Sequence, residues 1–492
     1  MKRVRDKHRL KRRVWRGASV IFTAALGCCF VYAAAPGSET ETVATTHARP
    51  PNIVFILADD HRWDYLSVKG HPFIETPNVD RIATEGILFN NAFVTTSLCS
   101  PSRASFLTGQ YPQQHGVQNN FTPWNNNNVT FFEYLKQQGY STAFIGKWHM
   151  PGGIPTLRGM DLFVTFDNVG GQGTYFNTPY IVNGKSLKVG ETPVPGAAVS
   201  GYITDDLTNF SLRYIEDNRD QPFVLYLSHK AVHLPMKPDD EAAGRYDTQQ
   251  VALPEDADSW LAFANGNFKH FLWGSLEEKI KDYAETAVAM DQQIGRVMDK
   301  LDELGLADNT LLVYAADNGY LWGEHRLIDK RWSYEESIRV PFVVRYPGVI
   351  SEPGSHSTEM ILNLDLAPTI LEVAGIPVPK HMQGQSLLPL LKGGGGDKVF
   401  RDAWLYSYFE DFPYPVPAQN AIRTKDYKLV DYERGKQDEL FDLRVDPRER
   451  NNLINDSSMT QTRLRLEKQL KKLKERASYT LPPSDTSAQE LR

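Results

Sequence analysis

Between residues 52 and 345 the chain repeatedly passes from a short apolar run to a longer stretch of mixed apolar and polar residues. The apolar runs contain many branched residues and end in charged or turn-forming ones, which predicts strands buried on both faces of a mostly parallel sheet. They cover residues 52–58, 142–146, 222–228, 310–316 and 340–345.

The mixed stretches predict helices that pack on this sheet. The longest covers residues 276–304 and keeps apolar residues three and four positions apart, as an amphipathic helix requires. Shorter helices are expected at residues 131–136, 204–218 and 365–374, and a helix followed by a short strand at residues 73–93.

Two regions have a different pattern, one inside this stretch and one near the C-terminus. Residues 158–200 are rich in Gly, Pro and Asn, which predicts irregular loops and small strands that face a substrate. The run of glycines at residues 393–396 is the best candidate for a domain linker. Beyond it, residues 404–409, 421–424 and 427–431 predict a small antiparallel sheet, and residues 462–477 predict a final charged helix.

The N-terminus resembles an export signal. Residues 1–16 hold nine Lys or Arg against one Asp, and residues 17–35 are uncharged and end in Ala33-Ala34-Ala35. A basic segment, an apolar segment and small residues predict a secretory signal peptide over residues 1–35, which places the protein in the periplasm or outside the cell. The alternative is an uncleaved anchor, the one case in which a membrane contact is expected. Residues 36–50 then predict an exposed tether.

Removal of this signal changes the charge and the cysteine content. The net charge of −6 becomes about −14 for the remainder. An acidic surface argues against nucleic acid as a partner, and an anionic substrate would need a local basic pocket. Cys28 and Cys29 leave with the signal, so Cys99 becomes the only cysteine and has no disulfide partner within the chain.

The stretch around Cys99 carries the strongest chemical signal. Cys99, Pro101 and Arg103 stand at alternate positions, and Leu107-Thr108-Gly109 follows after three further residues. One cysteine taken alone can be a small buried hydrophobe. This pattern, however, resembles the signature of the type I, formylglycine-dependent sulfatases. The resemblance implies that a maturation enzyme oxidises Cys99 to formylglycine and that the hydrated aldehyde is the nucleophile.

Acidic residues follow two of the predicted strands. Asp59 and Asp60 end the first apolar run, and Asp317-Asn318-Gly319 ends another. Taken alone, these pairs are typical of turns or helix caps. The sulfatase resemblance implies instead that Asp59, Asp60, Asp317, Asn318 and the modified residue 99 bind one Ca²⁺, a hard cation that prefers oxygen ligands.

Basic side chains follow another predicted strand. Lys147 and His149 come after residues 142–146, and they would share one face if the extended backbone continued. A lone Lys is usually solvated and a lone His is often structural. The match of Gly146-Lys147-Trp148-His149 to sulfatases implies that Arg103 and Lys147 orient the formylglycine diol and that His149 is the base that resolves the sulfated intermediate.

Three further residues are implied by the same resemblance. His233 and Lys330 would bind the sulfate and protonate the leaving alcohol. His229 competes with His233 for this role, and the family places its histidine just before a residue-Pro pair, which favours His233. His325 is expected to line the substrate pocket.

The resemblance extends from about residue 52 to residue 452 and implies an alkaline-phosphatase-like α/β sandwich. In this fold a large, mostly parallel sheet lies between helices in a catalytic domain (residues 51–392), and a small antiparallel sheet forms a C-terminal subdomain (residues 397–478). The alternatives are a phosphodiesterase or phosphonate monoester hydrolase of the same superfamily, and an exported glycan-binding protein on an inactive scaffold. Asn318, where some of those hydrolases carry His, favours a sulfatase.

The substrate is less closely defined. The segments 71–73, 93–99 and 171–175 are similar to those of bacterial N-acetylglucosamine-6-sulfatases and arylsulfatases. This similarity implies a sulfated carbohydrate such as heparan, mucin or an algal polysaccharide. It does not distinguish the sugar, the position of the sulfate, or exo from endo action, because specificity lies in loops.

Overall fold

The computed structural model describes residues 49–152, 157–255, 257, 275–394, 399–411 and 414–480, and these belong to one compact unit. The expected signal peptide, nearly all of the expected tether, and Gly395 and Gly396 of the expected linker lie outside the described residues. The division into a catalytic domain and a C-terminal subdomain stays a prediction.

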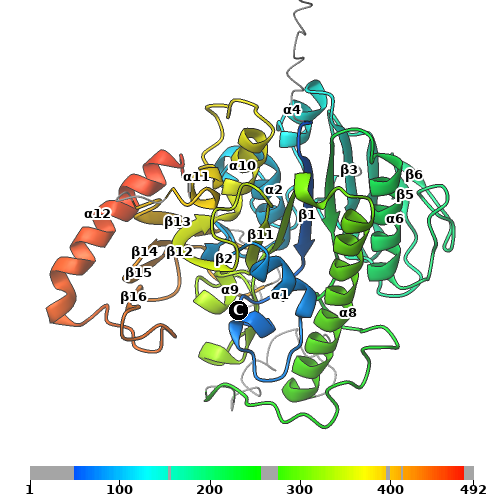
Figure 1. The fold of residues 1–492 in the computed structure, drawn as a ribbon. Coiled ribbons are helices and arrows are strands. Elements are labelled where there is room, and N and C mark those ends of the chain that lie inside the picture. Colours follow the sequence, from blue (N-terminus) through cyan, green and yellow to red (C-terminus); the bar gives the residue numbers. More distant parts are fainter. Residues whose placement is uncertain are drawn as a thin grey trace, which may run out of the picture. The chain divides into compact units, whose positions relative to one another are not determined.

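The largest sheet has ten strands in the order β12-β2-β11-β8-β1-β7-β3-β4-β5-β6 (Figure 1). Its centre, from β8 to β4, is parallel throughout, whereas β11 and β5 run antiparallel to their neighbours. The strands are β1 Asn52–Ala58, β2 Ile87–Phe93, β3 Ser141–Gly146, β4 Leu162–Thr165, β5 Ile181–Val182, β6 Lys185–Ser186, β7 Phe223–Ser228, β8 Thr310–Ala316, β11 Phe342–Arg345 and β12 Ser355–Leu362. The predicted α/β fold is confirmed.

The burial of the strands explains which of them the sequence predicted. Every residue of β1, β7 and β8 is buried, so their continuous apolar runs match strands covered on both faces. No apolar run predicted β12, because this strand lies at the sheet edge and its first five residues are not buried. Such a strand needs no apolar run.

Helices cover the sheet in two groups, and in Figure 1 α6 and α8 lie on one side of β1 while α2 and α10 lie on the other. One group contains α1, α6 and α8, which pack on one another, and the other contains α2, α4 and α10. The helices are α1 Pro77–Thr84, α2 Cys99–Thr108, α3 Pro112–His115, α4 Phe131–Gln137, α5 Asn168–Gly171, α6 Ile203–Asp217, α8 Leu276–Glu303, α9 Glu335–Ile338, α10 Leu366–Val373, α11 Leu388–Leu391 and α12 Thr460–Arg476. Within the described part of the chain, none is long and apolar enough to cross a bilayer.

Helix α8 shows how local sequence sets an element. Ser275 caps its first turn: the serine Oγ accepts from the Glu278 amide at 3.1 Å, and the Glu278 carboxylate accepts from the Ser275 amide at 2.7 Å. This reciprocal arrangement satisfies two amide groups that a helix start otherwise leaves unpaired. The helix therefore begins at Leu276, the predicted start.

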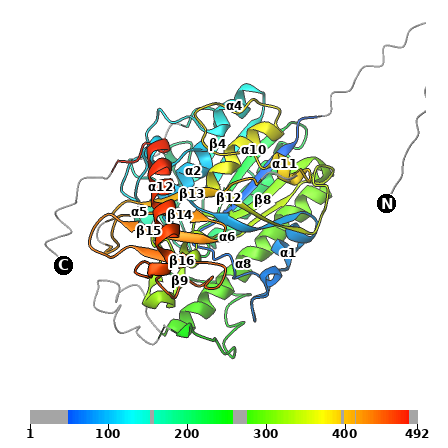
Figure 2. The same cartoon turned by 90° about the vertical axis from the view of Figure 1, so that its left-hand side faces the viewer.

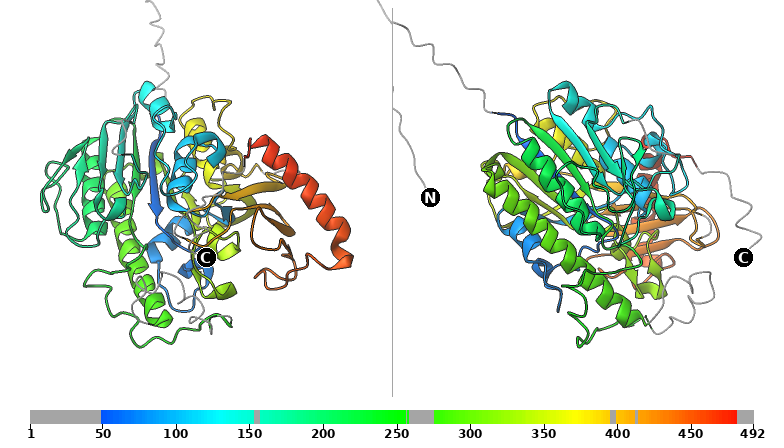
Figure 3. Two further views of the ribbon diagram at one scale, coloured as in Figure 1. Left: turned by 180° about the vertical axis from the view of Figure 1, so that it is seen from behind. Right: turned by 90° about the vertical axis from the view of Figure 1, so that its right-hand side faces the viewer.

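The C-terminal region forms the predicted small antiparallel sheet, with strands β13 Ala403–Tyr408, β14 Gln419–Thr424, β15 Tyr427–Tyr432 and β16 Glu439–Asp442 in that order. Alternate residues point to opposite faces. Leu405, Ile422 and Leu429 pack with Leu466 and Leu470 of α12, which lies across the sheet (Figure 2). On the other face, aromatic residues of β13 join a core that includes residues of β2 and β12; Figure 3 shows this region from behind.

A buried group of charges lies between this small sheet and the larger one. We call Glu335, Arg423, Lys428 and Glu449 the junction cluster. The Lys428 Nζ lies 2.9 Å from Glu335 and 2.5 Å from Glu449, and Arg423 lies 3.3 Å from both oxygens of Glu335. Lys428 also donates to the Ser333 carbonyl at 2.8 Å. The cluster thus pairs two carboxylates with two cations and ties them to the backbone.

Candidate active site

The candidate site lies where four neighbouring parallel strands end. Strands β8, β1, β7 and β3 are adjacent in the sheet. They are followed respectively by Asp317-Asn318, Asp59-Asp60, residues 229–233 and Lys147. Polar groups that follow parallel strands meet at one edge of an open α/β sheet, where ligands commonly bind. The sequence order therefore accounts for this convergence.

Gly146 allows β3 to deliver Lys147 to this edge. Its φ is +126°, and a Cβ at this position would lie 1.8 Å from the Ser228 carbonyl oxygen of β7. The Lys147 amide then donates to the same carbonyl at 2.8 Å. Only glycine fits such an approach, which is a physical reason for the Gly-Lys pair.

Helix α2 brings Cys99 and Arg103 to the same edge. Cys99 is its first residue, and Arg103 lies one turn later on the same side. The Arg103 guanidinium donates to Asp317 at 2.8 Å, to the Ser228 hydroxyl at 2.6 Å and to the Lys147 carbonyl at 2.8 Å. One arginine thus fixes α2 to the ends of three strands.

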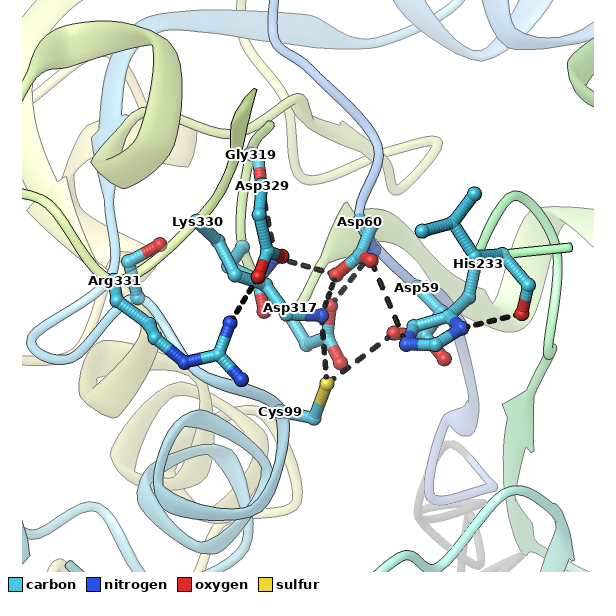
Figure 4. A network of polar contacts seen from close by, with 12 residues as sticks. Asp59, Asp60, Cys99, His233, Asp317, Gly319, Asp329, Lys330 and Arg331 are labelled. Carbon is cyan, nitrogen blue, oxygen red and sulfur yellow. Dashed lines mark hydrogen bonds and ion pairs between the residues drawn. The ribbon is translucent and has the colours of Figure 1, made fainter. Parts of the chain in front are cut away.

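The Cys99 sulfur points into a charged group (Figure 4). Its Sγ is 3.6 Å from an Asp59 oxygen, 3.1 Å from the Lys330 Nζ and 3.9 Å from the Lys147 Nζ. The residue is 0% exposed, and burial raises the pKa of its thiol to about 12 despite both lysines. The unmodified thiol is therefore protonated at neutral pH, and a protonated thiol is a weak nucleophile.

The two carboxylates of the Asp-Asp pair differ in charge state. Burial would raise the pKa of Asp59, but Lys147, His233 and Arg103 outweigh it and hold this pKa well below its usual range. For Asp60, burial and the carboxylates of Asp59 and Asp317 outweigh the contact with Lys330 and raise its pKa to about 7. Three acidic groups so close together would be stabilised by a further cation.

The residues present fit a metal ion. Ligand atoms of Asp59, Asp60, Cys99 and His233 all lie within 4.8 Å of one another. The Asn318 amide nitrogen donates to Asp60 at 2.6 Å, which leaves its buried Oδ1 without a partner. Asp317 adjoins the group, although one oxygen accepts from the Asp60 amide and the other from Arg103. Carboxylate and amide oxygens suit a hard divalent cation.

His149 reaches the site by a different route from the predicted one. The extended backbone does not continue beyond Gly146, because His149 has a φ of +57°. The ring instead meets Gln172, which the sequence analysis did not single out. The Lys147 Nζ donates to the Gln172 Oε1 at 2.6 Å, and the Gln172 amide meets the His149 Nε2 at 2.6 Å.

This bridge determines the proton on His149. Because Lys147 can only donate, the Gln172 oxygen faces Lys147 and its NH₂ group donates to His149. The Nε2 of His149 is then the acceptor, and a neutral ring carries its proton on Nδ1. Burial and Lys147 hold the pKa of His149 well below its usual range, so the ring is neutral.

Of the two competing histidines, His233 faces the carboxylates. Its Nδ1 donates to the Leu234 carbonyl at 2.7 Å, and its Nε2 lies 3.7 Å from Asp60. Both ring nitrogens of His229 are buried and have no hydrogen-bond partner in the described structure. Burial lowers the pKa of His229 to about 3. The geometry thus favours His233, as the sulfatase resemblance does.

Two residues beside His233 were also missed. Tyr175 donates its hydroxyl to the His233 carbonyl at 2.8 Å, and the Lys230 Nζ lies 5.0 Å from the Tyr175 ring centre. Burial and Lys147 lower the pKa of Lys230 to about 7. Tyr175 belongs to the predicted substrate-facing loops, but no pattern in the sequence linked it to His233.

His325 occupies a separate position. Its ring stacks on Tyr334 with centres 3.7 Å apart, and its Nε2 lies 3.6 Å from Glu336. No hydrogen bond, ion pair or ring contact links it to Cys99 within the described residues, so its role in substrate binding stays a prediction.

Comparisons with known proteins agree with this geometry. A sulfatase family model matches residues 51–376, and a model described as N-sulphoglucosamine sulphohydrolase, C-terminal, matches residues 323–476. An N-acetylglucosamine-6-O-sulfatase of Bacteroides thetaiotaomicron is 31% identical over 82% of this chain and 82% of its own.

Solved structures are similar as well. A protein in complex with its substrate D-glucosamine-2-N,6-O-disulfate has a TM-score of 0.78 and 29% identity over 87% of this chain and 98% of its own. A phosphonate monoester hydrolase of Agrobacterium radiobacter, 24% identical, has a TM-score of 0.72 over 87% of this chain and 96% of its own, which shows a shared fold alone.

Proposed function

The chain belongs to the sulfatase family and is a sulfuric ester hydrolase, and from this premise we propose that it removes sulfate from a glycan with a formylglycine made from Cys99. The observation that carries the proposal is the position of Cys99. It begins α2 between two lysines and the Asp59 carboxylate, fully buried, as a protonated thiol of low reactivity.

The modified residue would supply covalent catalysis. One hydroxyl of the hydrated aldehyde would attack sulfur as the ester S–O bond breaks, and loss of a proton from the other hydroxyl would then expel sulfate and restore the aldehyde. A serine at this position would remain sulfated, because it has no second hydroxyl to lose a proton.

The surrounding cations fit an anionic substrate. Lys147 and Lys330 both reach Cys99 and pair with Asp59 and Asp60, so a sulfate that entered would meet two ammonium groups at once. Positive charge placed where negative charge develops is a large contribution to catalysis. His233 would protonate the leaving alcohol through its Nε2, which points into the same group. The Nδ1 proton is held by the Leu234 carbonyl, and burial and Lys147 hold the pKa of His233 well below its usual range. The Nε2 would therefore first take up the proton that the attacking hydroxyl releases.

His149 is the proposed base for the second step. Gln172 holds its neutral ring, which keeps a lone pair on Nε2. For this nitrogen to take a proton, the Gln172 amide has to release it. The bridge from Lys147 through Gln172 therefore ties the base to the lysine that is expected to orient the formylglycine diol.

Asp59, Asp60, Asp317, Asn318 and residue 99 would hold Ca²⁺, with His233 as a neighbour. The ion would neutralise negative charge on the sulfate oxygens. The orphaned Asn318 Oδ1 and the raised pKa of Asp60 support a cation here, and hard oxygen donors support Ca²⁺ over a softer metal.

The substrate is proposed from the relatives. The similar proteins act on N-acetylglucosamine 6-sulfate by name or bind D-glucosamine-2-N,6-O-disulfate as substrate, which supports a sulfated amino sugar in a glycan. The predicted signal peptide supports export to the periplasm or beyond, where such polymers are met.

Two measurements test the proposal. Mass spectrometry of the peptide that contains residue 99, from protein matured in a host with the oxidising enzyme, should show the loss of sulfur that formylglycine requires. A panel of sulfated sugars, assayed beside a phosphonate monoester and a phosphodiester, should give the highest kcat/KM for a sulfated amino sugar. Unmodified Cys99 in an active enzyme would overturn the mechanism, and preference for a phosphorus ester would overturn the activity.

A further inference from the structure

A second cavity lies away from the candidate active site. It has a volume of about 680 Å³ and is lined by α12, by the segment from Val399 to Leu405, and by Tyr111, Gln383 and Gln385. We call it the α12 groove. A space of this size is large enough to hold a sugar residue or two.

The groove is separate from the catalytic group. Tyr111 follows the C-terminal end of α2, where its amide donates to Gln383 and the Gln383 amide donates to the Gly109 carbonyl. Cys99 is the first residue of the same helix. Ten helical residues span about 15 Å, so α2 separates the groove from Cys99.

The charge of α12 contrasts with that of the chain. The helix holds seven basic residues against two acidic ones, in a protein whose net charge is −6. Lys472 and Arg476 lie one turn apart and both line the groove. Both are exposed, and neither side chain makes a hydrogen bond or ion pair with another described residue. Cations left free on an acidic protein are available to an anionic ligand.

The rest of the lining mixes polar and aromatic residues with aliphatic ones, which are Leu362, Val399, Ala403, Leu405, Leu473 and Ala477. Arg401 is neutralised by a two-point pair with Asp365 at 2.7 and 2.8 Å, so it forms an uncharged floor. Gln469 has a buried Oε1 without a partner, and Phe400 and Tyr111 are partly buried. Amides that bind hydroxyls and rings that pack on sugar faces are typical of a carbohydrate site. One acid, Asp402, also lines the cavity.

We propose that the α12 groove is a second binding site for a sulfated polysaccharide, held by Lys472 and Arg476 and by the amides beside them. This inference rests on the proposed function, which makes the substrate a sulfated glycan. A polymer bound here would raise the local concentration of its sulfate esters near the active site. A single sulfated sugar would gain nothing from the groove.

The test measures binding separately from turnover. In the Cys99→Ala protein, which cannot hydrolyse its ligand, the affinity for a sulfated heparan octasaccharide is measured by calorimetry with and without Lys472→Ala plus Arg476→Ala. The double change should weaken binding about tenfold, as the loss of two charge-assisted contacts predicts. The matched control is Lys468→Ala plus Lys471→Ala, which removes the same charge from the same helix outside the groove.

Kinetics supply the second readout. In the active enzyme, the groove variant should lower the ratio of kcat/KM for the polymer to kcat/KM for the sulfated monosaccharide about tenfold. Equal effects of the groove and control variants, equal binding of the desulfated octasaccharide, or equal binding of an oligonucleotide would each overturn the proposal. If the active enzyme hydrolyses no sulfate ester while the groove still binds the octasaccharide selectively, the proposed function fails and the second site stands.

Discussion

The active site and the junction cluster both bury carboxylates against cations, yet they differ in what else those cations contact. In the junction cluster Lys428 and Arg423 also donate to the carbonyls of Ser333 and Lys425. In the active site Arg103 also donates to a carbonyl, that of Lys147, but among the described residues the ammonium groups of Lys147 and Lys330 contact only side chains, including the Cys99 sulfur. Buried charge alone therefore does not identify a catalytic centre. The distinguishing feature is convergence on one reactive atom, with contacts that a ligand can replace.

The distinction between the two clusters would be wrong if Cys99 had only a structural role. Cys99→Ala should lower sulfate release by about 10⁶-fold, the scale on which removal of a nucleophile acts in other hydrolases, while the melting temperature changes little because only one sulfur atom is lost. Sulfate release by ion chromatography and thermal unfolding measure the two effects. Retained turnover in this variant would contradict the assignment.

A substitution in the junction cluster should have the opposite effect, lowering stability and leaving activity unchanged. Glu335→Gln should lower the free energy of unfolding by about 3–5 kcal/mol, because buried Arg423 loses its paired carboxylate and buried Lys428 keeps only Glu449, while kcat of the folded protein is unchanged. Burial would raise the pKa of Glu335, but Arg423 and Lys428 outweigh it and hold this pKa below the usual 4.5.

This pKa fixes the sign of the pH dependence. A lowered carboxyl pKa contributes stability above pH 4.5 that is lost as the pH falls further, so the deficit of Glu335→Gln should shrink by about 1.4 kcal/mol per pH unit below 4.5. Denaturant unfolding at pH 7 and at pH 3.5 checks this prediction. The control is Glu410→Gln, because the contacts of Glu410 in the described structure do not include the junction cluster. A deficit that stays constant between the two pH values would contradict the account.

Calcium should stabilise the protein through the active site and not through the junction cluster. Saturating Ca²⁺ at about 100 times its Kd should raise the free energy of unfolding by about 2.7 kcal/mol, and Asn318→Ala should reduce this gain while Glu335→Gln leaves it intact. Thermal unfolding after chelation and re-addition of Ca²⁺ measures the shift. An equal response in the Asn318 variant would show that the ion binds elsewhere.

The smallest expected effect concerns Gln172. Gln172→Ala should lower kcat by about 10- to 100-fold without loss of stability, because His149 loses the partner that fixes its ring. Gln172→Glu should also raise the pH at which activity is lost on the acidic side, since a carboxylate favours the protonated ring. The pH profile of kcat distinguishes this from a merely structural role, in which the profile would not move.

Much of this site was predictable because the ends of buried strands can be located from the apolar runs in the sequence. Apolar runs such as residues 52–58 and 310–316 fix where Asp59 and Asp317 emerge, and parallel pairing brings those ends together. The bounds of the predicted helices differ from the observed ones by few residues. Residues such as Cys99 and His233 were assigned from the sulfatase resemblance, and the geometry places both among the carboxylates.

The rest depended on contacts that no local pattern records. Gln172 bridges Lys147 and His149 from a glycine-rich loop 23 residues beyond His149, and Gly173 beside it has a φ of +70° and lies against Phe166. The junction cluster joins residues about 90 positions apart. Long-range polar partners of this kind follow from the folded arrangement, not from periodicity.

The burial of Cys99 restricts when the protein can be modified during its biosynthesis. With no exposed surface, the thiol is beyond the reach of any other enzyme once α2 has packed against the sheet. The proposed oxidation must therefore happen on the nascent or unfolded polypeptide, in competition with folding itself. A chain that folds too early would be well formed and permanently inactive, so the yield of working enzyme depends on timing as much as on stability.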